Sequence, residues 1–121
     1  MSTGHAPINN ATTVVERHGS VTVVRPKVPL RSETIESIKG LVDGQLRAGM
    51  PLVVVDLSES PLIDGEGLEW LLKMDESCVN EGGVMRLCSA GELCRDILRI
   101  TGVGRRLELF DDVTQALASF A

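Results

Sequence analysis

The sequence predicts an α/β fold in which a β-hairpin precedes alternating helices and strands. Two short strand patterns, Thr12–Arg17 and Val21–Arg25, flank a turn at His18-Gly19-Ser20. Further along, Leu52–Asp56 is a continuous apolar run that ends in a carboxylate, as expected for a strand covered on both faces, and Val84–Cys88 is another predicted strand. Helical periodicity separates these runs, which indicates parallel central strands. We therefore expect a mixed central sheet with helices packed against it.

Four helices are predicted between and after these strands. The first has Ser32 as its N-cap and ends near Gly49 and Pro51. The second begins after Asp64 and ends at Glu81-Gly82-Gly83, and the third stops at Gly102. A short strand at Leu107–Phe110 then leads to a final helix from Asp111 or Asp112 to about Phe120. The predicted inner faces are Ile35, Ile38, Leu41, Val42 and Leu46 in the first helix, Leu68, Leu71, Leu72, Cys78 and Val79 in the second, and Leu93, Ile97, Leu98 and Ile100 in the third.

A chain of 121 residues is long enough for one domain with one core. We expect residues 1–10 to form a flexible arm and residues 11–121 to form the domain. The net charge of −5 argues against a nucleic-acid-binding protein and against adhesion to an anionic membrane. Because no apolar run is long enough to span a membrane and no leader pattern precedes the domain, we expect a cytoplasmic protein without direct membrane insertion.

Three cysteines, Cys78, Cys88 and Cys94, form no C-x-x-C pair and leave an odd number of thiols. A disulfide framework is therefore not expected, and the sequence favours reduced, mostly buried thiols. His5 and His18 have no Cys or His partner at metal-binding spacing, and no cofactor site is predicted. Gly102-Val103-Gly104 lacks the third glycine of a dinucleotide-binding motif.

The segment Leu62–Leu68 is predicted to be the junction at which a buried strand ends and the second helix begins. A helix amino terminus concentrates unpaired N–H groups and positive partial charge. Here the junction carries two carboxylates, Asp64 and Glu66, and no hydroxyl.

The stretch Leu52–Phe120 resembles the STAS family, typified by bacterial anti-sigma factor antagonists. Val53–Ser58 is similar to the family's apolar strand ending in Asp-Leu-Ser. Ile63–Leu68, which reads Ile-Asp-Gly-Glu-Gly-Leu, is similar to the family's Ile-Asp-Ser-Ser-Gly-Leu. The third block, similar to the family's helix-strand-helix ending, comprises Leu98–Val103, Leu109–Asp112 and Ala116-Leu117. The order and spacing of the blocks make the resemblance specific.

The resemblance implies a non-enzymatic protein-binding module whose partner is a serine kinase-like protein that also acts as an anti-sigma factor. In the family, phosphorylation of the first serine of the motif dissociates this complex, because it adds charge and bulk to the interface. The matching position here is Gly65, and Glu66 follows it. The resemblance thus implies a partner-binding surface at the start of the second helix that phosphorylation at the usual position does not control. A glycine there would also let a partner backbone approach closely.

Several roles remain open for the residues of this surface. Asp64 is either part of the partner site or only the N-cap of the second helix. Glu66 is either a permanent substitute for a phosphate or a first-turn acid that interacts favourably with the helix dipole. Ser58 and Ser60 are alternative modification sites or ordinary loop residues.

Trp70 and Met74 lie on a different side of the second helix from the predicted inner face. They are either exposed apolar anchors for the partner, as the periodicity suggests, or partly buried against a neighbouring helix. The residues predicted to bind the partner are Ser58, Asp64, Gly65, Glu66, Gly67 and Trp70.

Two other functions are compatible with the sequence. The first is a STAS subunit of a stress-signalling or transporter-ATPase assembly. The second is a small metal- or phosphate-dependent enzyme in which Asp56, Asp64 and Glu66 converge. A homodimer is possible under any of these functions. Arg105 and Arg106 are expected to pair loosely with nearby acids or to remain solvated.

Overall fold

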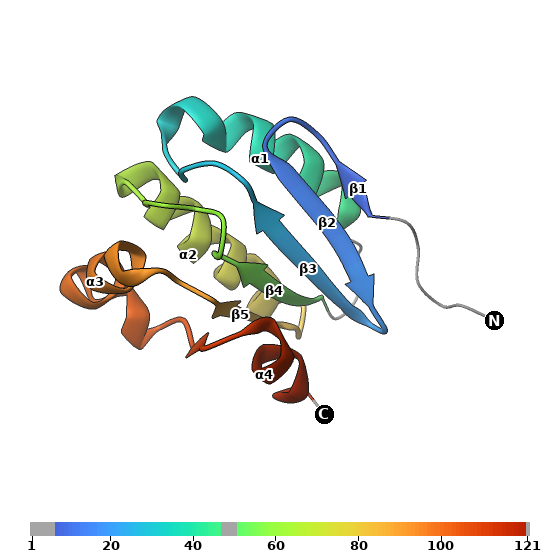
Figure 1. The fold of residues 1–121 in the computed structure, drawn as a ribbon. Helices are drawn as coiled ribbons and strands as arrows, with labels where there is room; N and C mark the ends of the chain where they lie inside the picture. The colour runs from blue at the N-terminus through green and yellow to red at the C-terminus, as the bar shows by residue number, and fades with distance from the viewer. Residues whose placement is uncertain (1–6, 47–50, 121) are drawn as a thin grey trace.

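The computed structural model describes residues 7–46 and 51–120, and within these ranges six strands form one sheet in the order β1-β2-β3-β4-β5-β6 (Figure 1). Antiparallel pairing joins β1 to β2 and β2 to β3, whereas β3 to β6 pair in parallel. The predicted mixed sheet is therefore confirmed. The strands are β1 (Ile8–Asn9), β2 (Thr13–His18), β3 (Val21–Pro26), β4 (Leu52–Asp56), β5 (Val84–Cys88) and β6 (Leu109–Phe110).

The strand β1 was not predicted, because its two residues carry no alternating pattern. Ile8 pairs with Val15, and Asn9 pairs with Val14. The predicted arm of residues 1–10 therefore does not extend over this strand. Residues 1–6, where the predicted arm begins, lie outside the described residues. Gly49, near which the first helix was expected to end, lies outside them as well.

Four α-helices and one short 3-10 turn complete the described part of the chain: α1 (Ser32–Gln45), α2 (Gly65–Asn80), α3 (Glu92–Thr101), η1 (Val103–Arg105) and α4 (Val113–Ala118). The first three helices cover one face of the sheet, and α4 packs on the opposite face over β4, β5 and β6 (Figure 1). The N-cap of α1 is Arg31, not Ser32 as expected, and Ser32 is the first helical residue.

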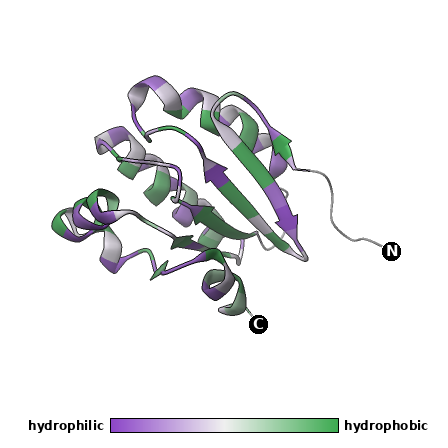
Figure 2. Cartoon of the chain, in the orientation of Figure 1, coloured by the Kyte–Doolittle hydropathy of each residue, from purple (hydrophilic) through white to green (hydrophobic). Residues whose placement is uncertain are grey.

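The alternation of the strands divides the core between the two faces of the sheet. On β4, Val53 and Val55 pack under α1, α2 and α3, whereas Val54 points to the smaller cluster beneath α4. Figure 2 shows the hydrophobic residues concentrated along the central strands and on the sides of the helices that face them. No helix within the described residues is long and apolar enough to cross a membrane.

The inner face of α2 differs from the predicted one. Trp70 and Met74 are buried, at 6% and 7% exposure. Of the two alternatives left open for Trp70, burial against a neighbouring helix is therefore confirmed, and Met74 is not an exposed anchor. Conversely, Val79 was assigned to the inner face but is 58% exposed. The buried positions recur at helical spacing, and they are Gly67, Trp70, Leu71, Met74 and Cys78.

The inner face of α3 is also narrower than predicted. Cys94 and Leu98 are buried, whereas Leu93 and Ile100 are exposed. Apolar residues extend around α3 beyond the stripe that contacts the sheet, so periodicity alone overestimated the buried face. All three cysteines are free and buried, as predicted.

Candidate functional site

The amino-terminal ends of α1 and α2 lie side by side because the segments before them pair with each other. The Leu30 N–H donates to the Leu62 carbonyl at 2.9 Å, and the Asp64 N–H donates to the Leu30 carbonyl at 2.9 Å. These bonds form an isolated parallel bridge between Leu30 and Ile63. Two helix amino termini, each with unpaired N–H groups, are thereby brought to one edge of the molecule.

Asp64 accepts hydrogen bonds from both helices at this edge. Its Oδ1 accepts from the Gly67 N–H at 3.0 Å and so caps α2. Its Oδ2 accepts from the Ser32 N–H, in the first turn of α1, at 3.3 Å. The N-cap role proposed for Asp64 is confirmed, and the bond to α1 adds a structural role that the sequence did not indicate.

The two glycines of the junction have opposite environments. Gly65 is exposed, and a Cβ placed there meets no heavy atom of the surrounding chain within 4 Å. Gly67 is buried, and a Cβ there would lie 2.4 Å from the Leu30 carbonyl oxygen and 2.8 Å from Ile63 Cγ2. Gly67 is therefore required for the close approach of α2 to the Leu30 segment, whereas the fold places no such demand on Gly65.

Glu66 is exposed in the first turn of α2 and stands at one end of a groove between α1 and α2. The groove has a volume of about 290 Å³. Trp70 and Met74 contribute to its lining from α2, and Ile35 contributes from α1. Trp70 is thus placed beside Glu66 but as a buried groove residue, not as a protruding anchor.

The loop after β4 contains the two candidate serines. Ser58 is exposed, and its N–H donates to Asp56 Oδ1 at 2.9 Å. Ser60 is buried, and its hydroxyl donates to the Pro26 carbonyl at 3.2 Å. A modifying enzyme would reach Ser58 directly, but it would reach Ser60 only after the loop had moved.

The acidic residues are not assembled as a metal site. Within residues 7–46 and 51–120, no group of three or more His, Cys, Asp or Glu side chains is arranged to hold a metal ion. Asp56 and Asp64 are engaged instead with the backbone of their own loop and helix termini. The convergence of Asp56, Asp64 and Glu66 that the enzyme alternative requires is therefore absent from this part of the chain.

The structure brings together Asp64, Gly65 and Glu66 at the start of α2, as the sequence predicted. Gly67 and Trp70 lie in the same helix but point into the fold. Sequence reasoning missed Leu30 and Ser32, because their contact with Asp64 joins residues more than thirty positions apart. The burial of Trp70 was detectable, since residues 67, 70, 71, 74 and 78 recur at helical spacing.

Comparison with known proteins supports the fold and the family. The family model of the STAS domain matches residues 12–116. An anti-sigma factor antagonist from Mycobacterium paratuberculosis is 25% identical, with a TM-score of 0.80, and the alignment covers 89% of this chain and 92% of that one. None of the curated proteins matches this chain.

Two further structures share the fold at lower identity. An anti-sigma-factor antagonist (STAS) domain protein from Planctomyces limnophilus is 22% identical, with a TM-score of 0.80 and coverage of 90% of this chain and 97% of that one. A sulfate transporter family protein from Wolinella succinogenes is also 22% identical, with a TM-score of 0.72 and coverage of 84% and 85%. These likenesses show the fold. The family model matches residues 12–116, which is most of the chain, so the chain belongs to the STAS domain family.

Proposed function

We propose that this chain is a non-enzymatic interaction module of the anti-sigma factor antagonist type. It binds an anti-sigma factor with a serine kinase-like fold through the start of α2, and phosphorylation at position 65 does not control the binding. The observation that supports this most directly is the exposed pair Gly65 and Glu66, presented at a junction that Asp64 fixes from both neighbouring helices. The proposal places the protein in the cytoplasm.

The rigidity of this junction favours protein recognition. Asp64 and the Leu30–Ile63 bridge hold both helix termini before any partner arrives, so little ordering is required on binding. Gly65 leaves the backbone of the first turn uncovered, which allows close approach by a partner. Ser58, exposed on the loop after β4, is proposed to lie at the periphery of the same surface.

The absence of a hydroxyl at position 65 is not imposed by the fold. Open space surrounds the position that a side chain would occupy, so a serine there would be tolerated. We therefore attribute Gly65 to the mode of control and not to packing. Under this proposal Glu66 contributes a fixed single negative charge to the surface, in contrast to the charge of nearly two that a phosphoserine would add and remove.

Co-purification of the tagged chain from its native cells, followed by mass spectrometry and reconstitution with the purified partner, tests the function. The expected partner is an anti-sigma factor with a serine kinase-like domain. Isolation of a transporter ATPase or of a large stress-signalling assembly in its place would contradict the proposal.

Incubation of the reconstituted pair with ATP tests the absence of phosphorylation control. The native chain is expected to gain no phosphate, whereas Gly65→Ser becomes a substrate because its hydroxyl occupies the exposed first turn. Phosphate on the native chain, mapped for example to Ser58, would overturn this part of the proposal. Ser60→Ala in the Gly65→Ser chain serves as a control, because Ser60 is buried and its loss should not change the incorporation.

A second candidate function is that of a STAS subunit in a larger assembly. The shared fold with a sulfate transporter family protein is the observation that favours it. In that case the start of α2 would contact other subunits permanently, and the isolated chain would bind no single anti-sigma factor. Analytical ultracentrifugation of the isolated chain also tests whether it forms the homodimer that the sequence leaves open.

A further inference from the structure

A second cavity lies on the other side of the molecule from β1, between α3, η1 and β6. It has a volume of about 300 Å³, within the range of small-molecule sites. Three arginines line it together with two leucines and a glycine, and the full set is Arg95, Leu98, Arg99, Gly104, Arg105 and Leu109. In a chain with a net charge of −5, such a concentration of positive charge is unusual.

The topology explains why the arginines meet. Arg95 and Arg99 are four residues apart on α3 and therefore share one side of that helix. The chain then reverses at Gly102, which adopts a left-handed conformation, and η1 returns along α3. Gly104 lies so close to α3 that a Cβ there would be 3.3 Å from the Leu98 carbonyl oxygen. This return brings Arg105 to the cavity that Arg95 and Arg99 also line.

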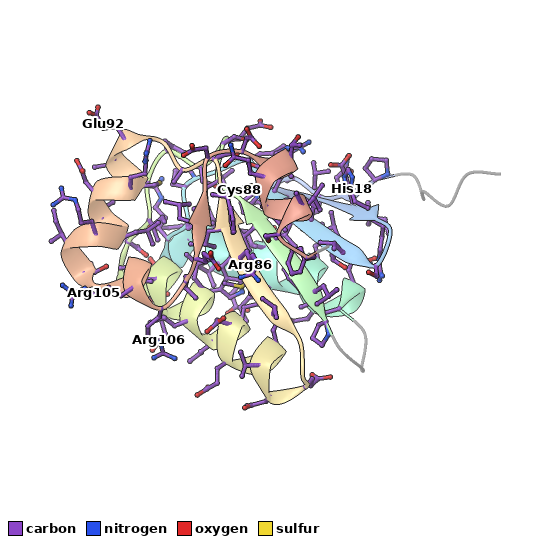
Figure 3. All side chains as sticks on the ribbon, turned by 90° about the horizontal axis from the view of Figure 1, so that it is seen from below. His18, Arg86, Cys88, Glu92, Arg105 and Arg106 are labelled. Carbon is purple, nitrogen blue, oxygen red and sulfur yellow. The ribbon has the colours of Figure 1, made fainter. Side chains whose placement is uncertain are left out.

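Most of this positive charge has no internal partner. Arg99 pairs with Asp96 at 3.1 Å, and both side chains are exposed. Within residues 7–46 and 51–120, Arg95 and Arg105 form neither an ion pair nor a side-chain hydrogen bond. Asp111 lines a small adjoining cavity together with Arg95. Figure 3 shows Glu92 at the opposite end of α3 from Arg105.

We propose that this cavity, termed the arginine pocket, binds the phosphoryl group of a small phosphate-bearing ligand. A guanidinium group presents donors in a planar fork that matches phosphate oxygens. One such fork satisfies a carboxylate, whereas three arginines provide enough donors and charge for the several oxygens of a phosphate dianion. Leu98 and Leu109 offer apolar contacts to any organic group attached to the phosphate.

Two features of the molecule oppose the binding of an anion here, and they make the test stringent. The carboxyl end of α3 carries partial negative charge. This charge stabilises the arginine side chains in the absence of a ligand and repels a bound anion. The acidic chain as a whole also repels anions. Affinity at this pocket therefore has to come from the arginines themselves, so removal of either unpaired one should be directly measurable.

Titration of the ¹⁵N-labelled full chain with phenyl phosphate, inorganic phosphate and benzoate tests the proposal. Phenyl phosphate is expected to shift the amide signals of Arg95, Gly104, Arg105 and Leu109, and to bind at least tenfold more tightly than benzoate. Equal binding of inorganic phosphate would identify free phosphate as the ligand, and tighter binding of phenyl phosphate would identify a phosphate ester. Both results support the pocket.

Arg95→Gln and Arg105→Gln are each expected to weaken phenyl phosphate binding at least fivefold. Arg106→Gln is the matched control, because Arg106 follows Arg105 in the sequence, is exposed and is absent from the lining of the pocket. Figure 3 labels both arginines. Arg106→Gln should change the affinity less than twofold. Undetectable binding of both phosphates, signal shifts elsewhere in the chain, or equal weakening by Arg106→Gln would overturn the proposal. Far-ultraviolet circular dichroism verifies that each variant is folded.

Discussion

The Asp64 carboxylate stabilises two helices at once, since each of its oxygens accepts an N–H from a different amino terminus. Asp112 provides an internal comparison, because it caps only α4 through the Gln115 N–H at 2.8 Å. We expect Asp64→Ala to lower the free energy of unfolding by about 2 kcal/mol and Asp112→Ala by about 1 kcal/mol. Urea unfolding measures both changes. Equal losses would show that the bond from Asp64 to α1 contributes nothing.

Gly65 and Gly67, two residues apart, should respond in opposite ways to the same substitution. Gly67→Ala places a methyl group against the Leu30 backbone and should destabilise the protein by about 2 kcal/mol, because backbone cannot move aside as a side chain can. Gly65→Ala enters open space and should be neutral or stabilise by roughly 0.5 kcal/mol. Thermal unfolding of both variants decides the matter, and a destabilising Gly65→Ala would refute the assigned open environment.

The packing of α1 against α2 depends on the face of α2 that Trp70 and Met74 occupy. Apolar residues surround much of this helix, so its sequence contains two overlapping stripes. The sheet and α1 together bury one of these stripes, because α2 packs against both, and the Leu30–Ile63 bridge joins the segments that precede α1 and α2. The true stripe has regular helical spacing, but only the tertiary arrangement shows that Val79 is excluded from it.

Trp70 is the single tryptophan of the chain and so reports on this helix pair. Because it is buried, its fluorescence emission should lie at shorter wavelength in the native protein than in urea, with low accessibility to acrylamide. Trp70→Ala should cost about 3–5 kcal/mol of stability, whereas Ile100→Ala, at an exposed position, should cost little. Emission that does not change on unfolding would contradict the burial of Trp70.

The sequence predicted the central strands better than any other part of the fold. The bounds of β4 and β5 are those expected. The continuous apolar run of β4 leaves few alternatives, and the glycines before Val84 mark where β5 begins. The strand β1 was missed because only its pairing with β2 defines it, and its two residues carry no strand pattern of their own. At the candidate site, the motif located Asp64, Gly65 and Glu66, but contacts over long sequence separation, such as those of Leu30 and Ser32, could not be anticipated.

Across the whole molecule, buried thiols lie on both faces of the sheet, Cys78 and Cys94 on one face and Cys88 on the other, and burial makes them resistant to ionisation. The pKa of Cys78 and that of Cys88 are each raised to about 11, chiefly by desolvation. A raised pKa means that the folded state holds the proton more tightly than the unfolded state. The resulting stability is fully present below pH 9 and is lost as the pH rises towards 11.

Alkaline unfolding therefore tests the packing of both faces together. The melting temperature should fall between pH 9 and pH 11. Cys78→Ser and Cys88→Ser should each make that fall less steep, although each variant is less stable than the native protein at neutral pH. Native thiols should also react slowly with a disulfide reagent at pH 8. Rapid reaction of all three thiols in the folded protein would contradict their burial.

We propose that the start of α2 binds the partner without phosphorylation at position 65. Calorimetric titration of the reconstituted anti-sigma factor with the unmodified chain, Gly65→Gln and Gly91→Gln tests this binding surface. Gly91 is a matched control, because it is exposed at the start of α3 and its Cβ position is also open. We predict strong binding by the unmodified chain and by Gly91→Gln, with a loss of at least roughly tenfold for Gly65→Gln. Undiminished binding by Gly65→Gln, or a greater loss for Gly91→Gln, would contradict the assignment of the partner surface.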